Sequence, residues 1–176
     1  MNPTIAAVLD ALDHVSLSFQ EKPLLIGGMA MEYYGMRKAG CDIDLVITDA
    51  DYQRLARLDP NSRKDIWGDL GIVVGRFEIW RSIALLDYDF YKHEAIDEGD
   101  ILVVSLDRLL LMRVLAMEVE KYRIDLDRIK QLYYDRYTNA AYYTEMQQHL
   151  EDYQRSGGTI FGGQYTQTEA FEEKTI

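Results

Sequence analysis

The sequence predicts an α/β (α+β) fold, with a small mixed β-sheet flanked by helices and a helical C-terminal half. Short apolar runs typical of strands alternate with helical patterns over residues 24–104, whereas residues 105–155 show helical periodicity alone. The 176 residues are enough to bury a sizeable core. We therefore expect a single domain over 1–155, with its core at 24–104 and its helical part at 105–155.

The first element is predicted as an amphipathic helix that begins at Pro3. Asn2 suits the N-cap position, and proline suits the first helical position. Apolar residues then recur at steps of three and four up to Phe19. Because Lys22 is followed by Pro23, we expect the helix to end before that pair.

The next elements alternate between strands and helices. An apolar run stopped by Gly27 and Gly28 predicts a buried strand and a tight turn. Thr48 or Asp49 suits the cap of a helix that carries Leu58 inward. Over this part of the chain we expect a strand at 24–26, a helix at 30–36, a strand at 43–47, a helix up to residue 58 and a turn at 59–62.

The remaining elements become helical toward the C-terminus. We expect β segments at 70–74, 77–83, 84–91 and 101–104. Ser105 is expected to cap an apolar helix at 106–122, and helices are expected at 124–134 and 138–153. Residues 156–176 are rich in Gly, Thr, Gln and Glu, a composition typical of a flexible or loosely docked tail.

Charge and cysteine content exclude some classes of function. Thirty acidic and 19 basic residues give a net charge of −11, which argues against a broad nucleic-acid surface but suits a divalent cation or a basic partner. The single cysteine, Cys41, permits no disulfide within the chain. We find neither a membrane-length apolar run nor a signal sequence, so a cytoplasmic protein without a membrane partner is expected.

Two aspartates stand at the start of the second predicted strand. Asp42 and Asp44 flank Ile43, so they are expected to project from the same face of that strand. Two carboxylates this close repel each other unless a cation or hydrogen-bond donors compensate. Mg²⁺ or Mn²⁺ is the simplest compensation, because hard divalent cations prefer oxygen ligands. The alternative is a strand start with solvated aspartates.

A second acidic pair interrupts the apolar run "ALLDYDFY". As a strand, this run would place Asp87 and Asp89 on one face. If it neighboured the strand that carries Asp42 and Asp44, three or four carboxylates would converge. Such a cluster can hold metal ions about 3.5–4 Å apart, which is the arrangement used in phosphoryl transfer. The pattern does not decide whether Asp87 or Asp89 is the third ligand.

Glycines and basic residues between the two strands are candidates for nucleotide binding. Gly27 and Gly28 would let backbone N–H groups approach a phosphate, although a plain tight turn is the alternative. Arg37 and Lys38 precede the aspartates and could contact a triphosphate. A solvated loop is the alternative for this basic pair.

The stretch "LLIGGMAMEYYGMRKAGCDIDLVI" resembles the signature of the nucleotidyltransferase superfamily with the DNA polymerase β-like fold. That signature is an apolar strand, Gly-Gly or Gly-Ser, a short helix, and Asp-x-Asp on the next strand. It looks most like the minimal prokaryotic branch that includes the AbiEii-type toxins of toxin–antitoxin pairs. The later stretch "VVSLDRLLLMRVLAMEVEKYRIDLDRI" also resembles the helical segment of that branch.

The resemblance implies a metal-dependent enzyme that transfers a nucleoside monophosphate from an NTP to an acceptor hydroxyl and releases pyrophosphate. Asp42 and Asp44, with Asp87 or Asp89, would hold Mg²⁺ or Mn²⁺, and Gly27 and Gly28 would cradle phosphates. The acceptor could be a small molecule, a protein or tRNA, and a protein partner is possible for a toxin–antitoxin component. The alternative is a catalytically inactive binding or regulatory module with the same fold.

Overall fold

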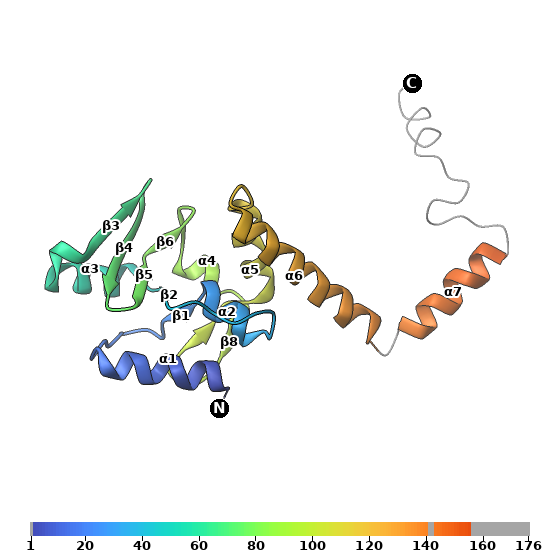
Figure 1. Cartoon of the computed structure of the whole chain (residues 1–176), viewed down its shortest axis with the longest axis horizontal. Coiled ribbons are helices and arrows are strands. Elements are labelled where there is room, and N and C mark those ends of the chain that lie inside the picture. Colours follow the sequence, from blue (N-terminus) through green and yellow to red (C-terminus); the bar gives the residue numbers. More distant parts are fainter. Residues whose placement is uncertain (1, 141–142, 156–176) are drawn as a thin grey trace, which may run out of the picture. The chain divides into compact units, whose positions relative to one another are not determined.

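A mixed β-sheet forms the centre of the fold, as predicted (Figure 1). Within the computed structural model, which describes residues 2–140 and 143–155, seven strands lie in the order β3-β4-β5-β2-β1-β9-β8. The parallel neighbours are β2 with β5 and β1 with β9, and the other neighbours are antiparallel. The strands of this sheet are β1 (Leu24–Leu25), β2 (Ile43–Val46), β3 (Arg63–Ile66), β4 (Asp69–Val74), β5 (Phe77–Trp80), β8 (Ile96–Asp97) and β9 (Leu102–Val103).

Helices account for most of the remaining described residues, and they dominate the C-terminal half, as predicted. They are α1 (Pro3–His14), α2 (Gly27–Tyr33), α3 (Asp49–Leu58), α4 (Tyr88–Lys92), α5 (Leu106–Leu115), α6 (Glu120–Thr138) and α7 (Tyr143–Arg155). A single 3₁₀ turn covers Pro60–Ser62, and a separate small sheet pairs β6 (Ser82–Ile83) with β7 (Leu86–Asp87).

Side-chain caps begin α1, α3 and α5, and the sequence predicted these three caps. Asn2 Oδ1 accepts from Thr4 N at 2.9 Å, and Thr48 Oγ1 accepts from Asp51 N at 3.2 Å. Ser105 Oγ accepts from Arg108 N at 3.4 Å. Each cap satisfies a backbone N–H that has no partner within its helix, so these boundaries follow from local chemistry.

The central strands β1 and β2 are apolar because they are covered by the helices of the domain. Leu24, Leu25, Ile43 and Leu45 are fully buried. Helix α2 connects β1 to β2 in the sequence, and it packs on β2 (Figure 1). Asp44 is therefore a carboxylate inside a strand whose other residues belong to the core.

Several predicted helix boundaries were wrong. The first helix ends at His14 rather than near Phe19, because Ser16 takes a positive φ of 52° that breaks the helical path. The helix predicted at 106–122 ends at Leu115, and α6 then begins at Glu120 and runs through the predicted start at 124. Leu58, predicted to point inward, is 74% exposed.

The strand predicted at 84–91 was also wrong. Only Leu86–Asp87 pairs as a strand, and the chain then turns into α4. Asp87 caps that helix by accepting from Phe90 N at 3.0 Å. The Asp87 side chain accepts a hydrogen bond from a backbone N–H of the helical turn that follows it, and this local bond favours a helix start. The alternation of apolar and acidic residues, which predicted a strand, did not decide the structure here.

Strands β3 and β8 were not predicted. β3 has the sequence Arg-Lys-Asp-Ile and lies at an edge of the sheet, where one face is solvated and charged residues are common. It shows none of the apolar content on which strand prediction relies. Its position matters because it carries Lys64 toward the centre of the sheet.

The chain divides into two compact units, Met1–Lys130 and Gln131–Ile176. The first contains the sheet and α1 to α5, and the second contains α7. The single domain over 1–155 stays a prediction, and the predicted tail at 156–176 lies outside the described residues. In the part of the chain that the structure describes, no helix combines the length and apolar character that crossing a membrane requires.

Candidate functional site

The turn from β1 into α2 is built around the side chain of Asp44. Ile26 N donates to Asp44 O at 3.0 Å, which holds the two segments together. Gly27 adopts a φ of +65°, and a Cβ added there would lie 2.0 Å from Asp44 Oδ2. A glycine is therefore required at position 27, both by its backbone conformation and by the close approach of the carboxylate.

Glu78 on β5 lies directly opposite Asp44. The parallel pairing of β2 with β5 puts the two residues in register, and their side chains share one face of the sheet. Both residues are half-buried. Glu78 was not predicted as a site residue, although the alternation in Phe-Glu-Ile-Trp places it on the opposite face from Phe77 and Ile79. The pairing of β2 with β5, which only the tertiary structure shows, identifies it as the partner of Asp44.

The half-buried carboxylate of Asp44 lies near two other carboxylates, Glu78 and Asp42. Burial raises its pKa above the ordinary value, and the charge of Glu78 raises it further. Arg113 and Lys121 act in the opposite direction, while Asp42 adds a smaller upward contribution. The repulsion predicted between neighbouring carboxylates therefore exists, but its main source is Glu78 rather than Asp42.

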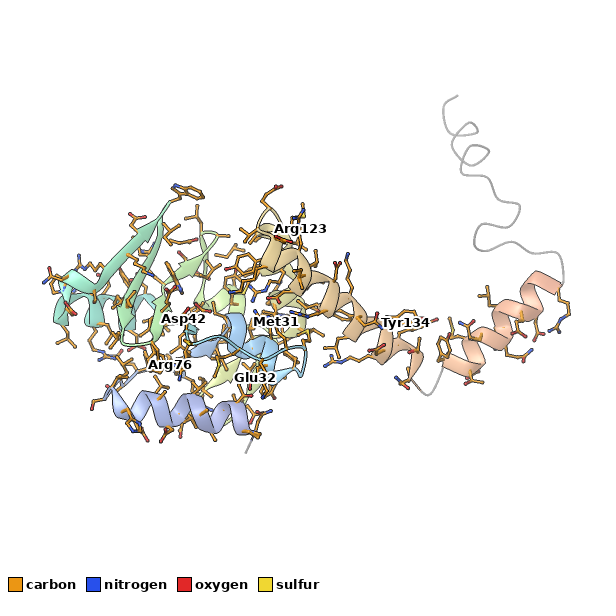
Figure 2. The ribbon with its side chains drawn as sticks, viewed as in Figure 1. Met31, Glu32, Asp42, Arg76, Arg123 and Tyr134 are labelled. Atoms are coloured by element: carbon orange, nitrogen blue, oxygen red, sulfur yellow. The ribbon has the colours of Figure 1, made fainter. Side chains whose placement is uncertain are left out.

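Asp42 lies just before β2 and is exposed. Arg76 stands beside this segment, and its Nε donates to Cys41 O at 2.7 Å (Figure 2). Ile43 N in turn donates to Arg76 O at 2.9 Å, which fixes the start of the strand. Asp42 thus lies at the open end of the strand, where it acts on Asp44 through its charge.

The structure does not bring Asp87 and Asp89 to the Asp42–Asp44 pair. Both line a different cavity, of about 360 Å³, together with Thr48, Asp49 and Arg81. Asp87 is the cap of α4, and Asp89 lies in the first turn of that helix. The predicted convergence of four carboxylates depended on a strand at 84–91, and this strand is not formed.

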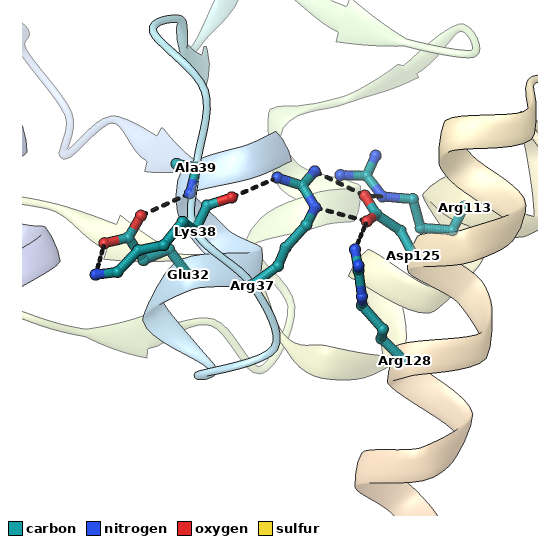
Figure 3. A network of polar contacts seen from close by, with 7 residues as sticks. All are labelled: Glu32, Arg37, Lys38, Ala39, Arg113, Asp125 and Arg128. Carbon is teal, nitrogen blue, oxygen red and sulfur yellow. Dashed lines mark hydrogen bonds and ion pairs between the residues drawn. The ribbon is translucent and has the colours of Figure 1, made fainter.

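Arg37 is held by Asp125 on α6 rather than left free for a ligand (Figure 3). Its Nε and Nη2 donate to the two carboxylate oxygens at 2.6 and 2.8 Å, and Nη1 donates to Lys38 O at 3.0 Å. Its guanidinium also packs near Gly28, where an added Cβ would lie 3.6 Å from Nη1. Arg37 therefore connects the loop before β2 to α6.

Three arginines surround the carboxylate of Asp125 (Figure 3). Asp125 is fully buried, and Arg113 Nε and Arg128 Nη1 lie 3.3 and 3.4 Å from its carboxylate oxygens. Burial alone would raise the pKa of this carboxyl, but the Arg37 hydrogen bonds and the three positive charges outweigh burial and hold it below the usual value.

Lys38 and Gly28, the other two predicted nucleotide-binding residues, make few close contacts. Lys38 Nζ lies 3.1 Å from Glu32 Oε1, and its side chain is 91% exposed. Gly28 has only ordinary contacts around an added Cβ. Within the described residues no side chain caps α2, so Gly28 lies in a helical first turn whose N–H groups are not capped by a side chain.

Asp44 and Glu78 open into a cavity of about 260 Å³. Arg113 and Tyr122 form part of its wall, and the Arg113 guanidinium lies 4.8 Å from the Tyr122 ring centre. Arg113 is 6% exposed, and among the described residues its Nε makes no hydrogen bond, although its distance to Asp125 qualifies as an ion pair. A buried positive charge thus borders the same cavity as the two carboxylates.

The carboxylate oxygens of Asp44 and Glu78 at this cavity are ligands of the type that a hard divalent cation prefers. Glu78 Oε1 already accepts from the ammonium group of Lys64 at 2.8 Å, so a cation neutralises it in this conformation. Within residues 2–140 and 143–155, no three His, Cys, Asp or Glu side chains are grouped as a ready metal site. Two carboxylates are nevertheless what Mg²⁺ commonly takes from a protein when substrate phosphates and water complete its shell.

Replacing Gly27 by Ala is expected to disturb Asp44 and to destabilise the fold. The left-handed conformation alone costs a non-glycine residue about 1–2 kcal/mol, and the new Cβ would also displace the carboxylate. Gly35→Ala is the matched control, because Gly35 has a φ of +75° with nothing within 4 Å of an added Cβ. Urea unfolding should show a larger loss for Gly27→Ala. Equal losses would contradict the close contact with Asp44.

Comparison with known proteins leaves the family open. The sequence matches no protein-family model, and a search of curated proteins finds no significant relative.

Proposed function

We propose that this protein is a metal-dependent nucleotidyltransferase that moves a nucleoside monophosphate from an NTP to an acceptor hydroxyl. The observation that carries the proposal is the arrangement of Gly27, Asp44 and Glu78. A glycine turn lies against a carboxylate, which stands in register with a second carboxylate on the next strand. This supports the resemblance of the glycine and Asp-x-Asp motif to that superfamily, with Glu78 in the role of the third carboxylate.

Asp44 and Glu78 would hold Mg²⁺ or Mn²⁺, and Asp42, at the open end of the strand, would add negative charge near the ion. The ion would supply charge stabilisation for the oxygens of the transferring phosphate. In the reaction the acceptor oxygen bonds to the α-phosphorus, and the bond to the β-phosphate oxygen breaks to release pyrophosphate. Glu78 would also accept the proton of the acceptor hydroxyl.

Arg113 and Lys121 supply positive charge near Asp44. A triphosphate brings several negative charges, so two cations beside the carboxylate pair favour its binding. Arg113 is the stronger candidate, because it borders the same cavity as Asp44 and its Nε has no hydrogen bond within the described residues. Arg37, which the sequence indicated as a phosphate ligand, is instead proposed to position the loop before β2.

An apolar cavity of about 380 Å³ adjoins the site and shares Ile66, Ile83, Met112 and Ala116 with it. Trp67, which is 97% exposed, lies at its rim. Such a surface offers stacking and apolar contact to a nucleobase or to an acceptor. Since the reaction consumes an NTP, we place the protein in the cytoplasm, where an acceptor such as a small molecule, a protein or tRNA is available.

A non-catalytic binding or regulatory module is the second candidate, and two observations favour it. The Glu78 carboxylate already accepts a hydrogen bond from the Lys64 ammonium group in this conformation. Met29, next to the glycines, is buried and has no hydroxyl to donate to a phosphate, unlike the serine or threonine of many members of the resembled superfamily. Such a module would act through a protein partner, as one component of a toxin–antitoxin pair does.

Calorimetric titration with each of the four NTPs, with and without Mg²⁺, separates the two candidates. The enzyme is expected to bind at least one NTP only when Mg²⁺ is present, and to transfer label from the matching α-³²P NTP to an acceptor in a cell extract. Absence of Mg²⁺-dependent binding for all four NTPs would argue for the non-catalytic module. Mn²⁺ serves as the second metal in the same titration.

A further inference from the structure

Lys64 reaches Glu78 across an intervening strand. Lys64 lies on β3 and Glu78 on β5, with β4 between them. Adjacent strands are about 4.8 Å apart, so the lysine stem must extend over roughly two strand spacings. Gly71 makes this possible, because it pairs with Lys64 in the β3–β4 register and has no side chain to obstruct the path.

Trp80 lies along the same path. It pairs with Gly71 on the other side of β4, and a Cβ added at Gly71 would lie 2.7 Å from the Trp80 ring. The Lys64 ammonium is 5.9 Å from the centre of that ring, within the range of a cation–π contact. Gly71, Trp80 and Glu78 thus define the position of the ammonium group on the face of the sheet that carries Asp44.

We propose that Lys64 is a built-in cation that occupies the metal position on Glu78, and that a divalent ion must displace it to bind. This inference rests on the proposed function. The ammonium group and a divalent ion both compete for the Glu78 carboxylate, and they repel each other. Once displaced, Lys64 remains beside the site with its positive charge free, and a phosphate group of the NTP is the anion that it would contact.

The Lys64–Glu78 ion pair is partly exposed, so a divalent ion can replace the ammonium group on the carboxylate. The Lys64 and Glu78 side chains are 38% and 32% exposed, so the ammonium can return to water when it leaves the carboxylate. An ion pair in this environment is weak enough to be replaced by a doubly charged ion. Before metal binds, Lys64 therefore reduces the repulsion between the Asp44 and Glu78 carboxylates. Because its displaced ammonium can contact a phosphate, Lys64 also links metal binding to phosphate binding.

Binding of Mn²⁺ alone, measured by calorimetry and by electron paramagnetic resonance, tests the inference on the full chain. Lys64→Met keeps the length of the stem and removes the charge. It is expected to bind Mn²⁺ about fivefold more tightly than the wild type, which is the scale of a partly exposed ion pair. Lys22→Met is the matched control, because Lys22 forms a similar pair with Asp97 at 2.7 Å outside the site. That control should bind Mn²⁺ as the wild type does.

The outcomes separate this inference from the proposed function. If the wild type binds Mn²⁺ and Lys64→Met binds it no more tightly, Lys64 does not compete and the inference is overturned, while the metal site stands. If neither protein binds Mn²⁺, the metal-dependent function fails and the inference fails with it. Lys64→Gln gives a second variant, and thermal unfolding confirms that each variant is folded.

Trp80 fluorescence gives a readout that is independent of affinity. The chain has two tryptophans, so Trp67→Phe leaves Trp80 as the only tryptophan, and excitation at the red edge of the absorption band selects it over the tyrosines. Addition of Mg²⁺ is expected to change the Trp80 emission as Lys64 moves, and the change should be lost when Lys64→Met is added to Trp67→Phe. A change of the same size without Lys64 would show that another group moves.

Discussion

Combining Asp44→Asn with Glu78→Gln is expected to lower nucleotidyl transfer by about 10³-fold or more. Removing one group that stabilises transition-state charge costs about 10²–10³-fold, and this double variant removes both in-register carboxylates. Transfer of label from α-³²P NTP measures the loss. Calorimetry should also show that Mg²⁺ no longer promotes NTP binding, because both proposed carboxylate ligands of the ion are neutralised.

Asp89→Asn is the control that separates the structural site from the one the sequence indicated. Asp89 is exposed and lines another cavity, with Asp49 and Arg81, so this variant is expected to transfer nucleotide as the wild type does. Loss of activity in Asp89→Asn with retention in Glu78→Gln alone would contradict the assignment of Glu78. Thermal unfolding of all three variants checks that the differences arise in the site.

Asp125→Asn is expected to have the largest effect on stability, a loss of about 3–5 kcal/mol in the free energy of unfolding. Asp125 is fully buried, and Arg113, which pairs with it, is 6% exposed. Breaking a buried ion pair by neutralising one partner leaves an uncompensated buried charge, and this accounts for the size of the loss. Denaturant unfolding monitored by far-UV circular dichroism measures it.

Asp127→Asn is the matched control, two residues further along α6. Asp127 is exposed and pairs with Lys130 on its own helix, so its replacement should change stability by less than about 0.5 kcal/mol. A similar loss for the two variants would contradict the role of the buried network. Arg37→Met should fall between them, because Asp125 would keep Arg113 and Arg128 as partners.

The same carboxylate makes stability depend on pH. The pKa of Asp125 is lower in the folded protein than in the unfolded chain, so its stabilising contribution is complete above the ordinary aspartate pKa of about 4. It is lost as the pH falls through the folded value. The free energy of unfolding should therefore decrease below about pH 4, and the decrease should be shallower in Asp125→Asn.

Local patterns were sufficient for the starts of α1, α3 and α5 and for the central strands. Asn2, Thr48 and Ser105 cap the predicted helices, and the apolar runs before Gly27 and after Asp42 form β1 and β2. These features depend on neighbouring residues, so the sequence contains the information directly. The placement of Asp44 on a buried strand was predictable for the same reason, whereas its close approach to Gly27 depends on the pairing of β1 with β2.

Long-range pairing decided the rest of the candidate site. The partner of Asp44 is Glu78 rather than Asp87 or Asp89, because β2 pairs with β5 whereas the second acidic pair lies at the start of α4. Arg37 likewise turned out to pair with Asp125, 88 residues away along the chain. Neither contact is visible in local periodicity, since each depends on which elements the core brings together.

The sequence by itself determined the α/β class, the glycine turn and the carboxylate on the strand that follows it. Tertiary structure alone decided that Glu78 completes the acidic pair, that Arg113 borders its cavity, and that Lys64 neutralises Glu78 from the edge strand. The physical reason is that capping and strand propensity act over a few residues. The field at a site is instead the sum of charges that the packing of distant segments brings together.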